Sequence, residues 1–307
     1  MSTDRTGESP VISVRDLRMQ YGDKTVLDGL AFDIAPGGVT ALLGPNGAGK
    51  TTTVEILEGF RQPSAGKAEV LGTDPLKGGD AWRARIGMVL QNWNDHGKWK
   101  VRETLSWFSD FYRPFTQPWD LDELLDIVGL TEHAGQRVGR LSGGQRRRLD
   151  VAAGVVGRPA LLFLDEPTTG FDPRAKRDFH DLVHRIADME GTTVLLTTHD
   201  LDEAAKLADR ILILAGGNLI ADDSPDALAR SVSDTSEIRW RENGVLQVHS
   251  SDDATAFVRK LLADEHADVR DLEVSRATLE DAYVSLVEAF EAGRADEAVT
   301  AFQEVTR

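Results

Sequence analysis

Short apolar runs alternate with amphipathic stretches through residues 1–221 of the chain. Five of these runs are four or five residues long and rich in Val, Ile and Leu, at positions 39–43, 86–90, 160–164, 193–197 and 211–214. Runs of this length and composition are typical of buried strands. Because helical patterns fill most of the intervals between them, we expect an α/β fold with a mainly parallel sheet covered on both faces. Residues 11–34 instead alternate apolar and polar positions between closely spaced turns, which predicts an additional antiparallel β layer.

The C-terminal part of the chain shows a second pattern of strands and helices. Residues 237–250 are expected to form a hairpin about Asn243–Gly244, because Asn-Gly favours a two-residue turn. Residues 269–274 favour an extended segment between helical patterns at 252–263 and 279–292. Together these elements predict a small C-terminal α/β domain.

The charge distribution marks a boundary before this C-terminal pattern. Residues 222–307 carry 20 acidic and 9 basic side chains, whereas residues 1–221 carry 31 and 26. The segment 216–224 is also rich in turn-forming residues. The sequence therefore predicts two domains, one over residues 11–221 and the other over residues 222–307.

Composition excludes several classes of protein. The 307 residues carry a net charge of −16, which would repel phosphate backbones and anionic lipid, so we expect neither a nucleic-acid partner nor a direct lipid anchor. The absence of cysteine excludes disulfides, thiol catalysis and cysteine-ligated metals. No apolar run approaches the roughly 18 residues that span a bilayer, and no signal-peptide pattern opens the sequence. We therefore expect a cytoplasmic protein, unless a partner holds it at a membrane.

A glycine-rich motif follows the first predicted buried strand. Residues 44–51 read GPNGAGKT and fit the pattern G-x-x-x-x-G-K-[ST], directly between that strand and a helical pattern. Such a phosphate loop wraps backbone N–H groups around the phosphates of a nucleotide, with Lys50 as a point charge and the Thr51 hydroxyl as a Mg²⁺ ligand. The predicted nucleotide-binding residues here are Gly44, Pro45, Asn46, Gly47, Ala48, Gly49, Lys50, Thr51 and Thr52.

Three other predicted strands end in polar residues suited to phosphate chemistry. Residues 161–164 run into Asp165, a predicted Mg²⁺ ligand, and Glu166, which is predicted to polarise the attacking water. His199 and Gln91 follow two further strands, so we expect them at the same edge of the sheet. Gln91 can ligate Mg²⁺ or orient water, and it can equally be an ordinary terminal amide.

A second anion-binding pattern opens a predicted helix. Residues 141–156 begin LSGGQ, which places free N–H groups and a hydroxyl at the positive end of the helix. An ordinary N-cap has the same pattern. Because the phosphate loop already holds its own nucleotide, a head-to-tail pair of subunits would give this segment a role at the γ-phosphate held by the other subunit. The residues predicted to act there are Ser142, Gly143, Gly144 and Gln145.

In this order and spacing, the motifs resemble the nucleotide-binding subunit of an ABC transporter over residues 11–221. The resemblance implies a P-loop NTPase core with a mainly parallel sheet, an N-terminal antiparallel β layer and a helical subdomain. It implies that Tyr21 stacks on adenine, although an aromatic side chain there can also belong to the β-layer core. It also implies that Asp172 crosses a dimer interface, that His199 contacts the γ-phosphate, and that Gln91 heads the loop that meets a transmembrane partner.

The C-terminal segments SPDAL and ATLEDAYVSLVEAF resemble drug-exporter ATPases of the daunorubicin-resistance type. That resemblance implies an ATP hydrolase that dimerises around two Mg²⁺-ATP, as a homodimer rather than a heterodimer, and drives a separate transmembrane permease in drug, lipid or polymer export. The protein would then be cytoplasmic and peripheral on the inner face of the cell membrane. Residues 222–307 would serve dimerisation or coupling.

Two other functions fit parts of the pattern. A soluble ABC ATPase of translation or DNA maintenance would usually carry a second cassette or a long coiled coil, and neither pattern occurs in this sequence. A regulatory module that binds ATP without turnover would be favoured by the absence of a carboxylate after Asp165, but Glu166 occupies that position.

Overall fold

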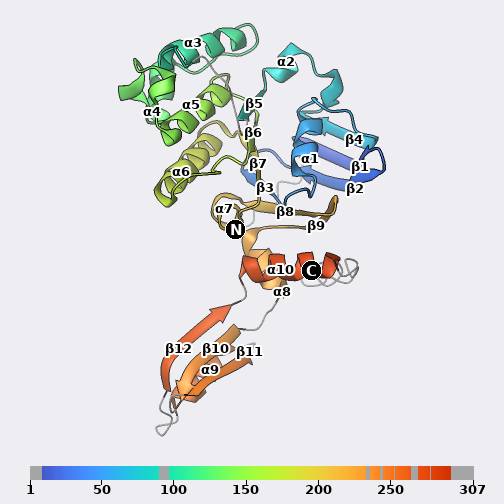
Figure 1. Cartoon of the computed structure of the whole chain (residues 1–307), viewed down its shortest axis with the longest axis vertical. Coiled ribbons are helices and arrows are strands. Elements are labelled where there is room, and N and C mark those ends of the chain that lie inside the picture. The colour runs from blue at the N-terminus through green and yellow to red at the C-terminus, as the bar shows by residue number, and fades with distance from the viewer. Residues whose placement is uncertain are drawn as a thin grey trace. The chain divides into compact units, whose positions relative to one another are not determined.

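The computed structural model describes residues 9–89, 97–232, 236–242, 245–251, 253–263, 269–276 and 278–291 (Figure 1). The chain forms two compact units, Met1–Leu219 and Ile220–Arg307. The charge pattern instead places a boundary between residues 221 and 222. The functional domain ranges 11–221 and 222–307 stay a prediction.

Six strands form the central sheet, in the order β5-β6-β7-β3-β8-β9. They are β3 (Val39–Leu43), β5 (Ile86–Val89), β6 (Leu161–Asp165), β7 (Thr193–Thr198), β8 (Arg210–Ala215) and β9 (Asn218–Asp223). The pairs β5–β6, β6–β7, β7–β3 and β3–β8 are parallel, so the predicted parallel sheet is confirmed. Every residue of β3 and β7 is buried, which explains why these strands are continuous runs without alternation.

The segment between β8 and the C-terminal unit contains a strand that the turn pattern did not predict. Gly216 and Gly217 have φ values of 52° and 81°, a conformation that favours glycine and reverses the chain after β8. The following residues then form β9 at the edge of the central sheet. A cluster of turn-forming residues shows where a strand ends, but it does not show whether another strand follows.

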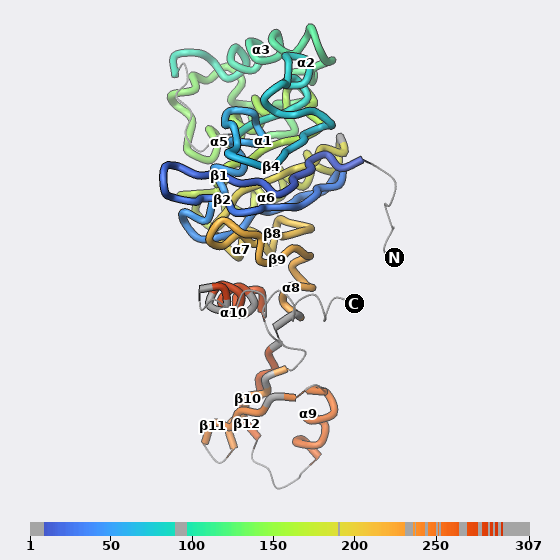
Figure 2. Tube along the Cα trace, turned by 90° about the vertical axis from the view of Figure 1, so that its right-hand side faces the viewer, coloured from blue at the N-terminus to red at the C-terminus, as the bar shows by residue number. Residues whose placement is uncertain are grey.

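An antiparallel sheet forms a second layer beside the central one (Figure 1 and Figure 2). It contains β1 (Ile12–Tyr21), β2 (Lys24–Ile34) and β4 (Ala65–Val70) in the order β2-β1-β4, as the alternating pattern of the first strands predicted. Leu17 and Leu27 of this sheet belong to one core cluster with Leu42 of β3 and Phe163 of β6. Burial of these apolar side chains joins the two sheets.

Seven α-helices are described in the first unit. They are α1 (Lys50–Leu57), α2 (Asp80–Arg83), α3 (Val101–Tyr112), α4 (Leu121–Ile127), α5 (Gly143–Val155), α6 (Pro173–Glu190) and α7 (Leu201–Leu207). Side-chain caps determine where several of them begin: Asp120 accepts from two N–H groups of α4, and Asp200 accepts from Glu203 N of α7. Helices α3, α4 and α5 lie together, as the helical subdomain implied by the resemblance (Figure 1).

The described part of the second unit contains a small antiparallel sheet and three helices. The elements are α8 (Pro225–Val232), β10 (Ser236–Glu242), β11 (Val245–Ser251), α9 (Ala254–Leu262), β12 (Val269–Arg276) and α10 (Leu279–Glu291). Pairing of Glu242 with Val245 confirms the hairpin, whose turn residues Asn243–Gly244 lie outside the described residues. Phe257 of α9 packs against Trp240, with ring centroids 5.7 Å apart, which fixes the helix on the sheet. Among the described residues, no helix is long and apolar enough to cross a membrane.

Candidate active site

The glycine-rich loop lies between β3 and α1, where the motif requires it. Gly44 leaves β3 so close to β8 that an added Cβ would lie 2.3 Å from the Leu214 carbonyl oxygen. Gly49 has a φ of 107°, and a Cβ there would lie 2.6 Å from Leu27 Cδ2. These two positions therefore require glycine for different reasons, a close approach and a left-handed backbone. Pro45, Asn46 and Gly47 are exposed, as is Thr51, whereas Ala48 is buried and Thr52 half-buried.

Lys50 is the first residue of α1 and is buried under the loop. Its Nζ donates to the Gly44 carbonyl at 2.7 Å and to the Pro45 carbonyl at 3.1 Å, so the ammonium group lies inside the curve of the loop. Burial lowers the pKa of Lys50, whereas the negative charges of Glu166 and Asp165 oppose this shift. The loop and the two carboxylates are therefore close enough to interact electrostatically.

Asp165 and Glu166 occupy the carboxyl end of β6, and β7 holds them there. Thr197 Oγ1 donates to Asp165 Oδ1 at 2.6 Å. The Glu166 N–H in turn donates to Thr197 Oγ1 at 3.0 Å and to the Thr197 carbonyl at 3.2 Å. Glu166 has a φ of 41°, a left-handed conformation that costs a non-glycine residue about 1–3 kcal/mol and is found most often at functional sites.

His199 follows β7 and meets the side chain of Glu166. Its Nδ1 lies 3.2 Å from Glu166 Oε1, with the imidazole half exposed and the carboxylate mostly buried. Thr169 Oγ1 donates to the other carboxylate oxygen at 3.3 Å. The structure thus brings together three of the predicted site residues, Asp165, Glu166 and His199, at one edge of the sheet.

A further carboxylate near this edge was not predicted from the sequence. Glu58 caps the end of α1, and burial, together with the charges of Asp165 and Glu55, raises the pKa of Glu58 to about 8. Thr197 was missed in the same way. The sequence did hold a signal for each position. Thr197 is a polar residue inside a buried apolar strand, and Glu58 is an acidic residue at the end of an apolar helix face.

The LSGGQ segment caps the N-terminus of α5. Ser142 Oγ accepts from Gln145 N at 3.3 Å, and Gln145 Oε1 accepts from Ser142 N at 3.0 Å, which is a capping box. Ser142 and Gly143 are exposed, and an added Cβ at Gly143 or Gly144 would meet no atom within 4 Å. Among the described residues, no hydrogen bond or ion pair links this segment to Lys50 or to the loop before it.

Two further predicted site residues, Asp172 and Tyr21, belong to other elements of the fold. Asp172 caps α6 and accepts from Arg174 N at 2.8 Å and Ala175 N at 3.0 Å, and these backbone hydrogen bonds lower the pKa of Asp172. Tyr21 ends β1 and is 42% exposed, with the Arg61 guanidinium 5.2 Å from the ring centroid, so it lies outside the β-layer core. Gln91 lies outside the described residues.

The parallel sheet, the phosphate loop and the carboxylates at the adjoining strand end define a P-loop nucleoside-triphosphate-binding protein. Residues 27–169 match the family described as ABC transporter. The chain is 42% identical over 238 residues to a daunorubicin resistance ATP-binding protein of Streptomyces coeruleorubidus, covering 76% of this chain and 75% of the relative. A second such protein of that organism is 38% identical over 299 residues, which cover 88% and 92% of the two chains. The chain therefore belongs to the ATP-binding proteins of ABC transporters, a family that hydrolyses ATP and works with transmembrane permeases.

Other relatives and solved structures agree with this assignment. A Nod factor export ATP-binding protein of Neorhizobium galegae is 41% identical over 225 residues, which cover 72% of this chain and 64% of the relative. The structure of cbiO1 from Clostridium perfringens, part of the ABC transporter complex cbiONQ, is 26% identical with a TM-score of 0.62, covering 71% and 90% of the two chains. A bacterial Atm1-family ABC exporter with ATP bound is 25% identical with a TM-score of 0.63, covering 73% and 40%. The predicted family, fold class and ATPase activity are confirmed.

Proposed function

We propose that this chain hydrolyses Mg²⁺-ATP as one subunit of a dimer that drives a separate export permease. The observation that carries the proposal is the meeting of Lys50, Asp165, Glu166 and His199 where β3, β6 and β7 end. Each of these groups suits one requirement of ATP hydrolysis. Lys50 can neutralise phosphate charge and Asp165 can bind the cation, while Glu166 can activate water and His199 can contact the γ-phosphate.

The phosphate loop would hold the nucleotide from one side. Its N–H groups and the positive end of α1 suit the β- and γ-phosphates, and Lys50 is already positioned inside the loop. The exposed ring of Tyr21 offers a face for adenine, beside the cation of Arg61.

Two residues of this site suit a magnesium ion. The Thr51 hydroxyl and the Asp165 carboxylate are the hard oxygen ligands that Mg²⁺ prefers, and Gln91 is proposed as a third ligand from sequence alone. The described residues contain no group of three or more His, Asp or Glu side chains arranged to hold a metal. This donor set therefore fits an ion that takes its remaining ligands from water and from the phosphates, and the ion would neutralise phosphate charge.

Glu166 would act as the general base. Its carboxylate accepts a proton from a water molecule as the water oxygen attacks the γ-phosphorus and the bond to the β-phosphate oxygen breaks. His199 contacts this carboxylate through Nδ1, so its second ring nitrogen remains available for the γ-phosphate. The turn at Glu166 keeps the base directed at this edge.

The LSGGQ segment supports a composite site made by two subunits. Ser142 and Gly143 present an exposed helix N-terminus, and among the described residues no hydrogen bond joins them to the phosphate loop of their own chain. In a head-to-tail dimer, Ser142, Gly143, Gly144 and Gln145 would meet the γ-phosphate held by the other subunit, and Asp172 would cross the interface. Because one chain carries both halves of the site, a homodimer suffices.

Export is the direction of transport that the relatives support. Those reported above act in daunorubicin resistance and Nod factor export by their names. Since no described helix can cross a membrane, the permease would be a separate chain that holds this subunit at the inner face of the cell membrane. Residues 222–307 are proposed to serve dimerisation or coupling.

The test is a comparison of the wild type with Glu166→Gln and Lys50→Ala. Loss of the general base should slow hydrolysis by about 10²-fold or more while Mg²⁺-ATP remains bound, so Glu166→Gln should elute as a dimer in size-exclusion chromatography only with Mg²⁺-ATP. Lys50→Ala should also lose turnover but stay monomeric, because its phosphate loop lacks the cation. Near-normal turnover of Glu166→Gln would contradict the proposal.

A further inference from the structure

Glu203 is a buried carboxylate beside the proposed active site, on α7. The residue is 3% exposed, and both of its side-chain oxygens accept hydroxyl hydrogen bonds. Thr168 Oγ1 donates to Oε1 at 2.6 Å, and Thr198 Oγ1 donates to Oε2 at 2.5 Å. A buried carboxylate is costly unless its hydrogen bonds are satisfied, so this pair of threonines gives Glu203 a defined position.

The two threonines belong to the two segments that carry the proposed hydrolytic residues. Thr168 follows Glu166 by two positions, and Thr198 directly precedes His199. One carboxylate therefore bridges the turn after β6 and the end of β7. The backbone of Glu203 is also held in place, because its N–H donates at 3.1 Å to Oδ1 of Asp200, the N-cap residue of α7.

Thr197 and Arg147 hold the same turn through further hydrogen bonds. Neighbouring residues of a strand point to opposite faces, so Thr197 reaches Asp165 and Glu166 while Thr198 reaches Glu203. The buried Arg147 of α5 donates from Nε to the Pro167 carbonyl at 2.9 Å and from Nη2 to the Asp165 carbonyl at 3.3 Å. Hydrogen bonds from several elements thus hold the left-handed turn at Glu166, which its strained φ requires.

We propose that Glu203 is a positioning residue for ATP hydrolysis: through Thr168 and Thr198 it fixes the spacing between Glu166 and His199. It touches neither nucleotide nor water and acts only through these two residues. The inference rests on the proposed function, in which Glu166 is the base. Loosening the bridge should therefore lower kcat, because a small displacement of a catalytic group is costly, and leave nucleotide binding at the phosphate loop unchanged.

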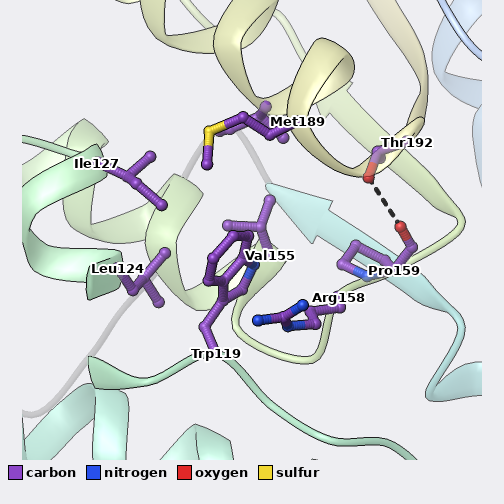
Figure 3. A pocket seen from close by; sticks show the side chains of 9 residues that line it. Trp119, Leu124, Ile127, Val155, Arg158, Pro159, Met189 and Thr192 are labelled. Atoms are coloured by element: carbon purple, nitrogen blue, oxygen red, sulfur yellow. Dashed lines mark hydrogen bonds between the residues drawn. The ribbon is translucent and has the colours of Figure 1, made fainter. Parts of the chain in front are cut away.

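The test changes a hydroxyl partner of Glu203, because Glu203→Ala would remove the acceptor of two buried hydroxyl donors at once and risk unfolding the chain. Thr168→Val removes one hydrogen bond at constant side-chain shape, and Thr168→Ser restores the hydroxyl. The matched control is Thr192→Val, because Thr168 and Thr192 are both 2% exposed. The Thr192 hydroxyl donates to the Pro159 carbonyl at 3.0 Å, before the start of β7 and so at the end opposite Thr198 (Figure 3). The readouts are steady-state Mg²⁺-ATP hydrolysis and thermal unfolding.

We expect Thr168→Val to lower kcat by about tenfold to a hundredfold with KM for Mg²⁺-ATP within about twofold, and Thr168→Ser to recover most of the loss. Thr192→Val should lower the unfolding temperature comparably and keep wild-type kcat. In the Glu166→Gln background, Thr168→Val should cause no further loss in single-turnover hydrolysis, because the residue that it positions is gone.

Three results would overturn the role of Glu203: wild-type kcat in Thr168→Val, an equal loss in Thr192→Val, or a full additional loss in the Glu166→Gln background. A failure of the proposed function gives a different result. A wild-type chain without Mg²⁺-ATPase activity, or Glu166→Gln with normal turnover, would remove both the proposed base and the residue that positions it.

Discussion

The imidazole of His199 and the carboxylate of Glu166 are joined at 3.2 Å although 33 positions separate them in the sequence. The contact exists because β6 and β7 are parallel neighbours, with Asp165 paired to Thr197, so that both strands end at the same level. The backbone of Glu166 is bound to the same strand through Thr197. If this pair is catalytic, as proposed, its position on two strand ends means that it needs little reorganisation when a nucleotide binds.

The proposed composite site predicts the behaviour of a variant in the LSGGQ segment. Gly143→Asp should fold, because a Cβ at this position would meet no atom within 4 Å. Its carboxylate would face the γ-phosphate held by the other subunit, so hydrolysis should be lost while nucleotide binding by the monomer persists. Binding of a fluorescent ATP analogue and a phosphate-release assay measure the two effects. Retention of most ATPase activity would rule out the dimer mechanism.

The exposed ring of Tyr21 predicts an effect on nucleotide affinity. Tyr21→Ala should weaken ATP binding roughly fivefold or more, since stacking on a base contributes about 1–3 kcal/mol. Tyr21→Phe keeps the ring and should bind as the wild type does, which makes it the control for the hydroxyl. Equilibrium titration with ATP distinguishes the variants. If Tyr21→Ala and Tyr21→Phe bind equally well, the ring does not contact adenine.

The buried carboxyl of Glu58 predicts a pH dependence of stability. Its pKa is raised from 4.5 to about 8 in the folded chain, so the folded state binds more protons than the unfolded state between these values. The free energy of unfolding should therefore fall as pH rises from about 4.5 to about 8, and Glu58→Gln should flatten this slope. Denaturant unfolding without nucleotide or Mg²⁺ measures it.

An exposed glutamate on α4 provides the control for this measurement. Glu123→Gln removes a carboxyl that is accessible to solvent, so the pH slope should remain that of the wild type. A wild-type slope in Glu58→Gln would show that another group causes the pH dependence.

The predicted domain division can be tested by truncation. A chain that ends at Ser224 retains β9 and the whole central sheet. It should fold and bind ATP, but in the Glu166→Gln background it should form the ATP-dependent dimer less well than the full chain. Circular dichroism, ATP binding and size-exclusion chromatography test the three expectations. An insoluble or nucleotide-free product would show that residues 225–307 belong to the main core.

The local pattern of the sequence was enough to predict the buried strands and the phosphate loop. Continuous apolar runs predicted β3, β6, β7 and β8, because strands buried on both faces cannot tolerate polar alternation. Residues 44–51 predicted the loop, since glycine, lysine and threonine must occur there at fixed spacing to surround a phosphate. The turn-rich segment after β8 predicted only a boundary, and β9 was missed because its six residues show no clear alternation.

Only the tertiary structure decided which side chains hold the site in place. Thr197, Thr198 and Glu203 read as ordinary strand and helix residues, and their roles depend on which strands are neighbours and on which face each side chain points. The raised pKa of Glu58 depends on burial beside Asp165, which no local pattern encodes. Residues that perform chemistry carry recognisable functional groups, whereas residues that position them are defined by contacts between distant segments, and packing of the whole chain creates those contacts.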